Sequence, residues 1–270
     1  MKLSYRKFLK FSPGALNVGK MLVEILIISL LSGSTTLIGV LLAMKFKQKT
    51  THLVFGIGIS SGVMITISFF ELLPAAFALV DGLFVILALI AGLLIIMVLD
   101  FLLPHMHFVK EKGKLGKIVK ISYLVAIGII IHDFPEGFAM VSSYSAAPAL
   151  GITVAIGIAF HNIPEEFALS FPLLLAKKKK SLIILAIVSA LAEPLGAVLG
   201  LVLISIAPNL NPILMAFAAG AMIYVTIDEL VPLAQKYERP AIFASGFLVG
   251  MITYLILTTI ISCNNLVVII

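Results

Sequence analysis

The stretch HDFPEGFAM at residues 132–140 is repeated as HNIPEEFAL at residues 161–169. In each copy a His and a Glu stand four residues apart, so both side chains project from one helical face about a turn from each other. A Pro precedes each Glu and has no N–H, which frees a main-chain carbonyl one turn earlier, at Ile131 and Phe160. Each copy therefore predicts a kinked helix that presents an imidazole, a carboxylate and a spare carbonyl oxygen to one side.

The composition of the whole chain places both copies in a membrane. Of 270 residues 61% are hydrophobic and 12% charged, with a mean hydropathy of +1.20, whereas a soluble domain is roughly 45–50% apolar and about 25% charged. A soluble enzyme, a disordered chain or a nucleic-acid binder needs more polar surface than this, despite the net charge of +6. The single cysteine, Cys263, excludes an intrachain disulfide and a Cys-rich metal site, so metal chemistry must use His and carboxylates.

Eight apolar runs have the length of a membrane-spanning helix, about 20 residues for roughly 30 Å of hydrocarbon. No segments of about ten alternating residues suggest a membrane barrel, so we expect an all-α polytopic membrane protein. The first run exceeds a signal-peptide core and has no small-residue cleavage site, which favours a retained helix. The predicted transmembrane helices are 21–44, 53–78, 82–103, 119–143, 150–176, 181–207, 212–235 and 240–262.

Basic residues distinguish the two sides of the predicted bundle. The connections 144–149 and 208–211 and the tail 263–270 carry no Lys or Arg. By the positive-inside rule the basic loops are cytoplasmic, which places both termini outside; the basic N-terminal tail opposes this orientation, but four loops outnumber it. The basic loops contain Lys45, Lys47 and Lys49, residues 110–120, residues 177–180, and Lys236 with Arg239.

Acidic residues are concentrated inside the predicted helices, which hold ten of the 13 in the chain. An acidic residue near a helix midpoint costs on the order of 2.5–3.5 kcal/mol on insertion scales. No Lys or Arg lies at that depth, so bound metal or bound protons are the remaining counter-charges. The five acids near midpoints are Asp133, Glu136, Glu165, Glu166 and Glu193.

A second pair of segments is also similar. Residues 60–76 align without gaps on residues 218–234 and match Glu71 with Glu229. These segments lie on predicted helices two and seven, which run in opposite directions, as do helices four and five with the His motifs. Nested antiparallel pairs are typical of an inverted-topology repeat, which places the substrate site at the midplane. We expect helices 1–3 to match helices 6–8 and helix 4 to match helix 5.

Other polar residues near the two His motifs extend the set of possible ligands. Asp133 and Asn162 follow the two histidines, and Glu193 lies mid-helix in AEPLG. For Glu166 two roles stay open: it is an extra metal ligand, or it makes an interhelical hydrogen bond. Mixed nitrogen and oxygen ligands suit Zn²⁺, Fe²⁺, Mn²⁺, Co²⁺ or Cd²⁺ better than Cu⁺ or Na⁺. Two adjacent ions that share bridging carboxylates would account for the number of acids.

The motifs of this chain, and their order, resemble those of the ZIP (Zrt/Irt-like) metal transporters, especially the GufA or ZupT-like prokaryotic branch of that family. They are GVM and ELLP on helix two, HDFPEG on four, HNIPE on five, AEPLG on six and DELVP on seven. The resemblance implies one domain over residues 1–270, with a basic tail at 1–20 and a third cytoplasmic-side loop at 104–118. It also implies a homodimeric transporter, not an enzyme, in a prokaryotic inner or plasma membrane. Divalent metal, Zn²⁺ first, would enter the cytoplasm as substrate, with no cofactor.

The resemblance also assigns roles to individual residues. It implies a primary and a second metal site bridged by Glu136 and Glu165, and helices one, four, five and six that slide as a unit. The chain departs from the family where Asp133 replaces a common Asn and Glu166 replaces a Gly. The predicted primary ligands are His132, Glu136, His161 and Glu165, with Met64 approaching them, and the second site adds Asp133, Asn162 and Glu193.

Two other functions use similar residues. An intramembrane metalloprotease would carry H-E-x-x-H, and no His-Glu pair occurs in this sequence. A proton or cation channel or pump would use the same carboxylates without metal, which the paired imidazole–carboxylate spacing disfavours. For His105 and His107 two interpretations stay open: they hold metal after its release, or they have no role in transport.

Overall fold

The computed structural model describes residues 18–46, 49–102, 113–175 and 177–263, and within these ranges the chain is helical with no strand. Each of the eight predicted transmembrane segments falls in a helical stretch, so the all-α prediction is confirmed. The elements in chain order are α2 (Val18–Lys45), α3 (Thr50–Thr66), η1 (Ile67–Leu72), α4 (Leu73–Leu79), α5 (Gly82–Leu102), α6 (Gly113–Ala146), α7 (Pro148–Leu169), α8 (Phe171–Leu175), α9 (Lys179–Ile206), η3 (Pro208–Leu210), α10 (Asn211–Val225), η4 (Thr226–Leu230), α11 (Val231–Gln235) and α12 (Pro240–Cys263).

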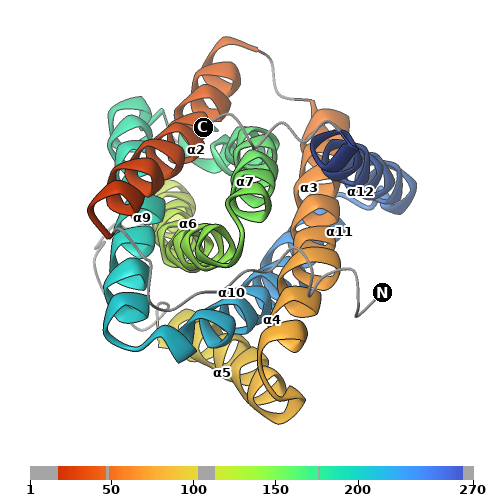
Figure 1. Cartoon of the computed structure of the whole chain (residues 1–270). Coiled ribbons are helices and arrows are strands. Elements are labelled where there is room, and N and C mark those ends of the chain that lie inside the picture. The colour runs from red at the N-terminus through yellow and green to blue at the C-terminus, as the bar shows by residue number, and fades with distance from the viewer. Residues whose placement is uncertain (1–17, 47–48, 103–112, 176, 264–270) are drawn as a thin grey trace.

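Two helices with the His motifs, α6 and α7, lie in the middle of the bundle, and the others surround them (Figure 1). On one side α2 and α9 pack against each other. In addition, α2 packs against α7, and α9 packs against α6. On the other side α3 contacts α7 and α10 contacts α6, while α12 and α5 pack outside α3 and α10. The polar motifs are thus enclosed by apolar helices.

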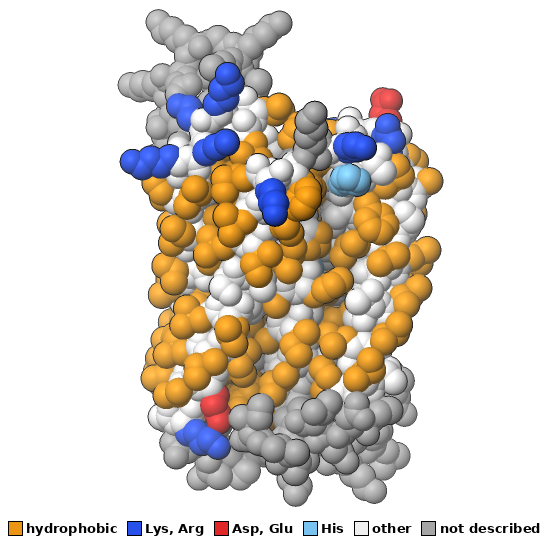
Figure 2. Space-filling view, turned by 90° about the horizontal axis from the view of Figure 1, so that it is seen from above, with side chains coloured by type: hydrophobic (Ala, Val, Ile, Leu, Met, Phe, Trp, Pro, Cys, Tyr) orange, Lys and Arg blue, Asp and Glu red, His pale blue; other side chains and the backbone are white. Residues whose placement is uncertain are grey.

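The outer surface is that of a membrane protein. Six stretches among the described residues are long and apolar enough to cross a bilayer, and they include α2, α5, α9 and α12. On α5 the buried residues Val85, Ala88, Gly92 and Ile96 recur at helical spacing, and most of the other side chains are exposed, as on a lipid-facing helix. Figure 2 shows a continuous apolar surface along the length of the molecule, with most of the Lys and Arg side chains in view gathered at one end.

Glycines bring the helices that carry the acids close together. A Cβ added at Gly196 of α9 would collide with the Phe134 carbonyl of α6, and one added at Gly137 of α6 would collide with the Glu193 carbonyl of α9. Small residues allow transmembrane helices to approach to backbone contact. This reciprocal contact places Glu193 beside the HDFPEG motif.

The second and seventh spans differ from the uninterrupted helices predicted from the sequence. Each contains a π-helical segment, η1 and η4, that ends two residues before a proline, Pro74 or Pro232. A proline lacks an N–H and its ring displaces the carbonyl four residues earlier, and the wider hydrogen bonding of a π segment accommodates both effects. Single-turn π segments are rare and are frequent at functional sites.

Two predicted boundaries were wrong. The fifth span was predicted over 150–176, but α7 ends at Leu169 and the short α8 follows. The loop predicted over 104–118 is helical from Gly113, because α6 extends beyond the apolar run at its basic end. The predictions for residues 1–17 of the tail, for His105 and His107, and for residues 264–270 lie outside the described residues.

Candidate metal centre

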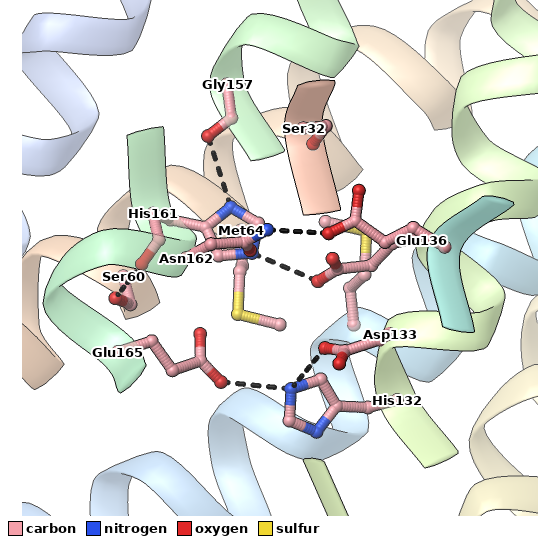
Figure 3. Close-up of polar contacts among 12 residues, drawn as sticks. Ser32, Ser60, Met64, His132, Asp133, Glu136, Gly157, His161, Asn162 and Glu165 are labelled. Atoms are coloured by element: carbon pink, nitrogen blue, oxygen red, sulfur yellow. Dashed lines mark hydrogen bonds and ion pairs between the residues drawn. The ribbon is translucent and has the colours of Figure 1, made fainter. Parts of the chain in front are cut away.

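The eight residues predicted as ligands converge between α6 and α7, with α9 and α3 closing the sides (Figure 3). All of them are buried, and His161, Glu136, Glu193 and Met64 are 0% exposed. Asp133 and Glu165, at 5% and 3%, are nearly as buried. The midpoint acids predicted from the sequence therefore lie inside the protein and away from lipid.

The two His motifs pair across the helices. His132 Nε2 lies 3.0 Å from Glu165 Oε1, and His161 Nε2 lies 3.0 Å from Glu136 Oε1. Each imidazole thus faces the Glu of the other motif, and that Glu stands four residues after the His of its own motif. Ion pairs therefore cross between α6 and α7, in addition to the chelate predicted within one helix, so a metal here would hold the two helices together.

The tautomer of His161 is set by its own helix. Its Nδ1 donates to the Gly157 carbonyl at 3.2 Å, because a carbonyl only accepts. The Nε2 lone pair is therefore the one available to ligate a metal, since a carbonyl that accepts from the other ring nitrogen fixes the tautomer of a metal-binding histidine in this way. The carbonyls of Gly157 and His161 accept side-chain hydrogen bonds at this site. The spare carbonyls predicted at Ile131 and Phe160 remain a prediction.

Asp133 completes a compact group on α6. The ligand atoms of His132, Asp133 and Glu136 all lie within 4.8 Å of one another. Asp133 Oδ1 is 3.5 Å from His132 Nε2, and the Ser189 hydroxyl of α9 donates to Asp133 Oδ2. Ser189 thereby holds the carboxylate with its other oxygen toward the imidazole.

Asn162 occupies the matching position on α7 but has a different partner. Its amide Nδ2 donates to Glu193 Oε1 at 2.6 Å. Asp133 and Asn162 follow the two histidines in the same register, yet one binds Ser189 and the other Glu193. The two positions therefore differ in charge and also in environment.

Several atoms of this cluster have no hydrogen-bond donor among the described residues. They include Glu136 Oε2, Glu165 Oε2 and Glu193 Oε2, all of them buried. A buried carboxylate oxygen without a donor is costly, and buried polar groups in proteins are normally satisfied. These oxygens, next to two imidazoles, form a donor set of the kind that binds Zn²⁺ and similar ions.

Met64 reaches the cluster from α3. The Ser60 hydroxyl, one turn earlier on α3, donates to the His161 carbonyl at 2.8 Å, which sets the height of α3 against α7. Thr226 Oγ1, which also bonds the Met222 carbonyl, lies 3.8 Å from Met64 Sδ, so the thioether lies between α3 and η4. Figure 3 shows Met64 among the His and Glu side chains.

Sequence reasoning missed Ser60, Ser189 and Thr226. A serine or threonine on an apolar helix usually bonds a carbonyl of its own helix, as Ser142 does with Phe138. Nothing in the sequence separates the hydroxyls that cross to another helix from those that do not.

A model of the ZIP zinc transporter family matches residues 109–259. Similar curated proteins include the zinc transporter ZupT of Escherichia fergusonii, 38% identical over 238 residues, which span 84% of this chain and 92% of that protein. ZupT of Chlorobium limicola is 36% identical over 250 residues, 84% and 93% of the two chains. The chain belongs to the ZIP family. The predicted family is thus confirmed, and with it a transporter rather than an enzyme.

In this ZIP protein the two departures from the family motifs occupy different places. Asp133 lies within the cluster beside His132. Glu166 is also buried, with 6% of its surface exposed, but it lies on the other face of α7 from Glu165, toward α9. The replacement of Gly by Glu166 therefore adds a buried carboxylate outside the predicted ligand set.

The pairing of Asn162 with Glu193 generates a first prediction. Asn162→Asp replaces the amide donor by a carboxylate facing Glu193, and the loss of a donor to a buried charged acceptor costs about 1–3 kcal/mol. The metal-free variant should unfold at a lower temperature than wild type, and Zn²⁺ should raise its midpoint by more, because the ion relieves the repulsion. Thermal unfolding of the purified protein with chelator and with Zn²⁺ measures both.

The matched control is Asn211→Asp, the same substitution at a buried asparagine outside the cluster. Its Zn²⁺-induced shift should equal that of wild type. An Asn162→Asp variant that gains no more from Zn²⁺ than the control does would show that position 162 does not face the metal.

Proposed function

We propose that this ZIP protein carries divalent transition metal, Zn²⁺ first, through the centre between α6 and α7 into the cytoplasm. The observation that carries the proposal is the crossed pair of His–Glu contacts with unpartnered carboxylate oxygens beside them. The relatives that match most of the chain are named as zinc transporters. The metal is the transported substrate, and the proposal includes no cofactor.

Within this centre we propose two adjacent ions. His132, His161, Glu136 and Glu165 would hold the first, with Met64 close by, because these side chains already face one another across α6 and α7. Asp133, Asn162 and Glu193 would hold the second. Glu136 and Glu165 each have one oxygen near an imidazole and another without a donor, as a bridging carboxylate requires.

The inverted repeat predicted from the sequence is part of the proposal, and the packing supports it. Exchanging α2 with α9, α3 with α10, α5 with α12 and α6 with α7 converts each major contact into another: α6–α9 into α7–α2, and α3–α12 into α10–α5. The two π segments exchange with each other as well.

Close approaches at glycines follow the same exchange. A Cβ on Gly196 would collide with the Phe134 carbonyl, and one on Gly39 with the Ile163 carbonyl, each carbonyl belonging to the residue two before a motif Glu. The helices α2 and α9 therefore contact α7 and α6 at equivalent points of the two motifs.

The same packing supports movement of α2, α6, α7 and α9 as a unit. These helices pack on one another, and they meet the remaining helices chiefly along α3–α7 and α6–α10. A slide along these two seams would carry the centre from one side of the membrane to the other. The homodimer and the single domain over residues 1–270 that the family resemblance implies remain predictions.

Removal of either bridging carboxylate should abolish transport. Glu136→Ala and Glu165→Ala each take away an oxygen donor that the imidazole of the other motif faces, so Zn²⁺ uptake should fall to the background of empty vesicles. The measurement is uptake into vesicles that contain a metal-sensitive dye, against a panel of divalent ions with and without a pH gradient.

Glu24→Ala is the matched control, because Glu24 is a helix carboxylate outside the centre that pairs with Lys20 and Tyr144. Its uptake should match wild type. Metal uptake that survives in both centre variants would contradict the proposal. A proton leak without metal uptake in wild type would favour the channel that uses these carboxylates without metal.

The proposed orientation places the basic end of the molecule in the cytoplasm and both termini outside. In a Cys263→Ser background, Lys49→Cys and Lys236→Cys lie at the basic end and Asn209→Cys at the other, all at exposed positions. An impermeant thiol reagent applied to intact cells should label Asn209→Cys alone. Labelling of the two basic-end cysteines with protection of Asn209→Cys would reverse the orientation.

A further inference from the structure

Glu166 is a buried carboxylate that the proposed metal centre does not use. It is 6% exposed and lies within the α7 span, where a charge needs compensation. Among the described residues no ion pair joins Glu166 to a Lys or Arg. Its stem passes α2 at Gly39, where an added Cβ would lie 2.9 Å from the Glu166 Cβ. The carboxylate is thereby directed away from His161 and toward α9.

One hydroxyl lies between Glu166 and the metal centre. Ser189 of α9 donates to Asp133 Oδ2 and lines the same small cavity as Glu166. A hydroxyl has a single proton, so it serves only one of these two carboxylates at a time. Because the Ser189 proton goes to Asp133, Ser189 presents only its oxygen to the cavity that Glu166 lines. Two acids and a hydroxyl oxygen arranged in this way form a set of hard oxygen ligands for a cation.

The Glu166 side chain also borders a small cavity. It measures about 10 Å³, roughly the space that one water molecule or one small ion occupies. Glu166 and Ser189 are its polar lining, and the remainder is Ala186 with four leucines of α7, α8 and α9. The cavity extends from Ser189 toward Leu182, the direction of the basic end of α9, and so lies on the proposed cytoplasmic side of Asp133.

We propose that Glu166, Ser189 and Asp133 form a third divalent-cation site, on the cytoplasmic side of the two-ion centre. Asp133 belongs to both sites, so an ion that leaves the centre moves to Glu166 without losing all its carboxylate ligands. The Glu166 oxygens, one Asp133 oxygen and the Ser189 oxygen supply the protein ligands, and the cavity admits one water. The inference rests on the proposed function, since it extends the path of the same metal.

Equilibrium dialysis of the purified full-length protein against Zn²⁺ tests the third site. Glu166→Gln keeps the size and hydrogen-bonding capacity of the side chain and removes its charge, and Glu166→Gly restores the residue that the family motif has there. Both variants should bind one Zn²⁺ fewer per chain than wild type at saturation and keep the tighter ions. Ser189→Ala should weaken the same ion by at least severalfold.

Glu24→Gln is the matched control, and it should bind as many ions as wild type. A Glu166→Gln variant that binds as many ions as wild type, with equal affinity, would overturn the inference and identify Glu166 as a hydrogen-bonding group. Failure of the proposed function has a different signature. Glu136→Ala would then bind as many Zn²⁺ ions as wild type, or wild type would bind no Zn²⁺ at all. Either result would overturn the third site as well.

Discussion

Carboxylates at the middle of a bilayer require a positive charge beside them, and this chain places five there with no Lys or Arg among the described residues at that depth. Two imidazoles, those of His132 and His161, are too few to balance five carboxylates. The rest of the fold can be understood from this requirement. The two helices with the His motifs occupy the centre, six apolar stretches surround them, and unpartnered carboxylate oxygens lie buried in the cluster that contains both histidines.

The packing makes that arrangement possible. Gly137 and Gly196 allow α6 and α9 to approach until Glu193 reaches Asn162 of α7, a distance that larger residues would prevent. Ser60 fixes α3 against the His161 carbonyl, which brings Met64 to the same height. Metal affinity and helix packing are therefore coupled, since an ion that binds the crossed His–Glu pairs also joins α6 to α7.

Much of this organisation could be predicted from the sequence, because a membrane helix has to be long and apolar and its charged residues therefore stand out. The spans, the two His motifs and the five buried acids follow from that rule. The crossed pairing could not be predicted, since helical spacing reports only which residues share a face of one helix. The π segments before Pro74 and Pro232 and the role of Ser189 depend on how neighbouring helices approach, which periodicity does not encode.

The central claim is that imidazoles and carboxylates from both motifs bind the same metal. X-ray absorption at the zinc edge of the Zn²⁺-loaded protein measures this most directly. The account predicts nitrogen and oxygen ligands at about 2.0–2.1 Å with the outer-shell scattering of imidazole, reduced in His132→Ala and in His161→Ala alike. A spectrum without imidazole scattering, or one that the two substitutions leave unchanged, would contradict it.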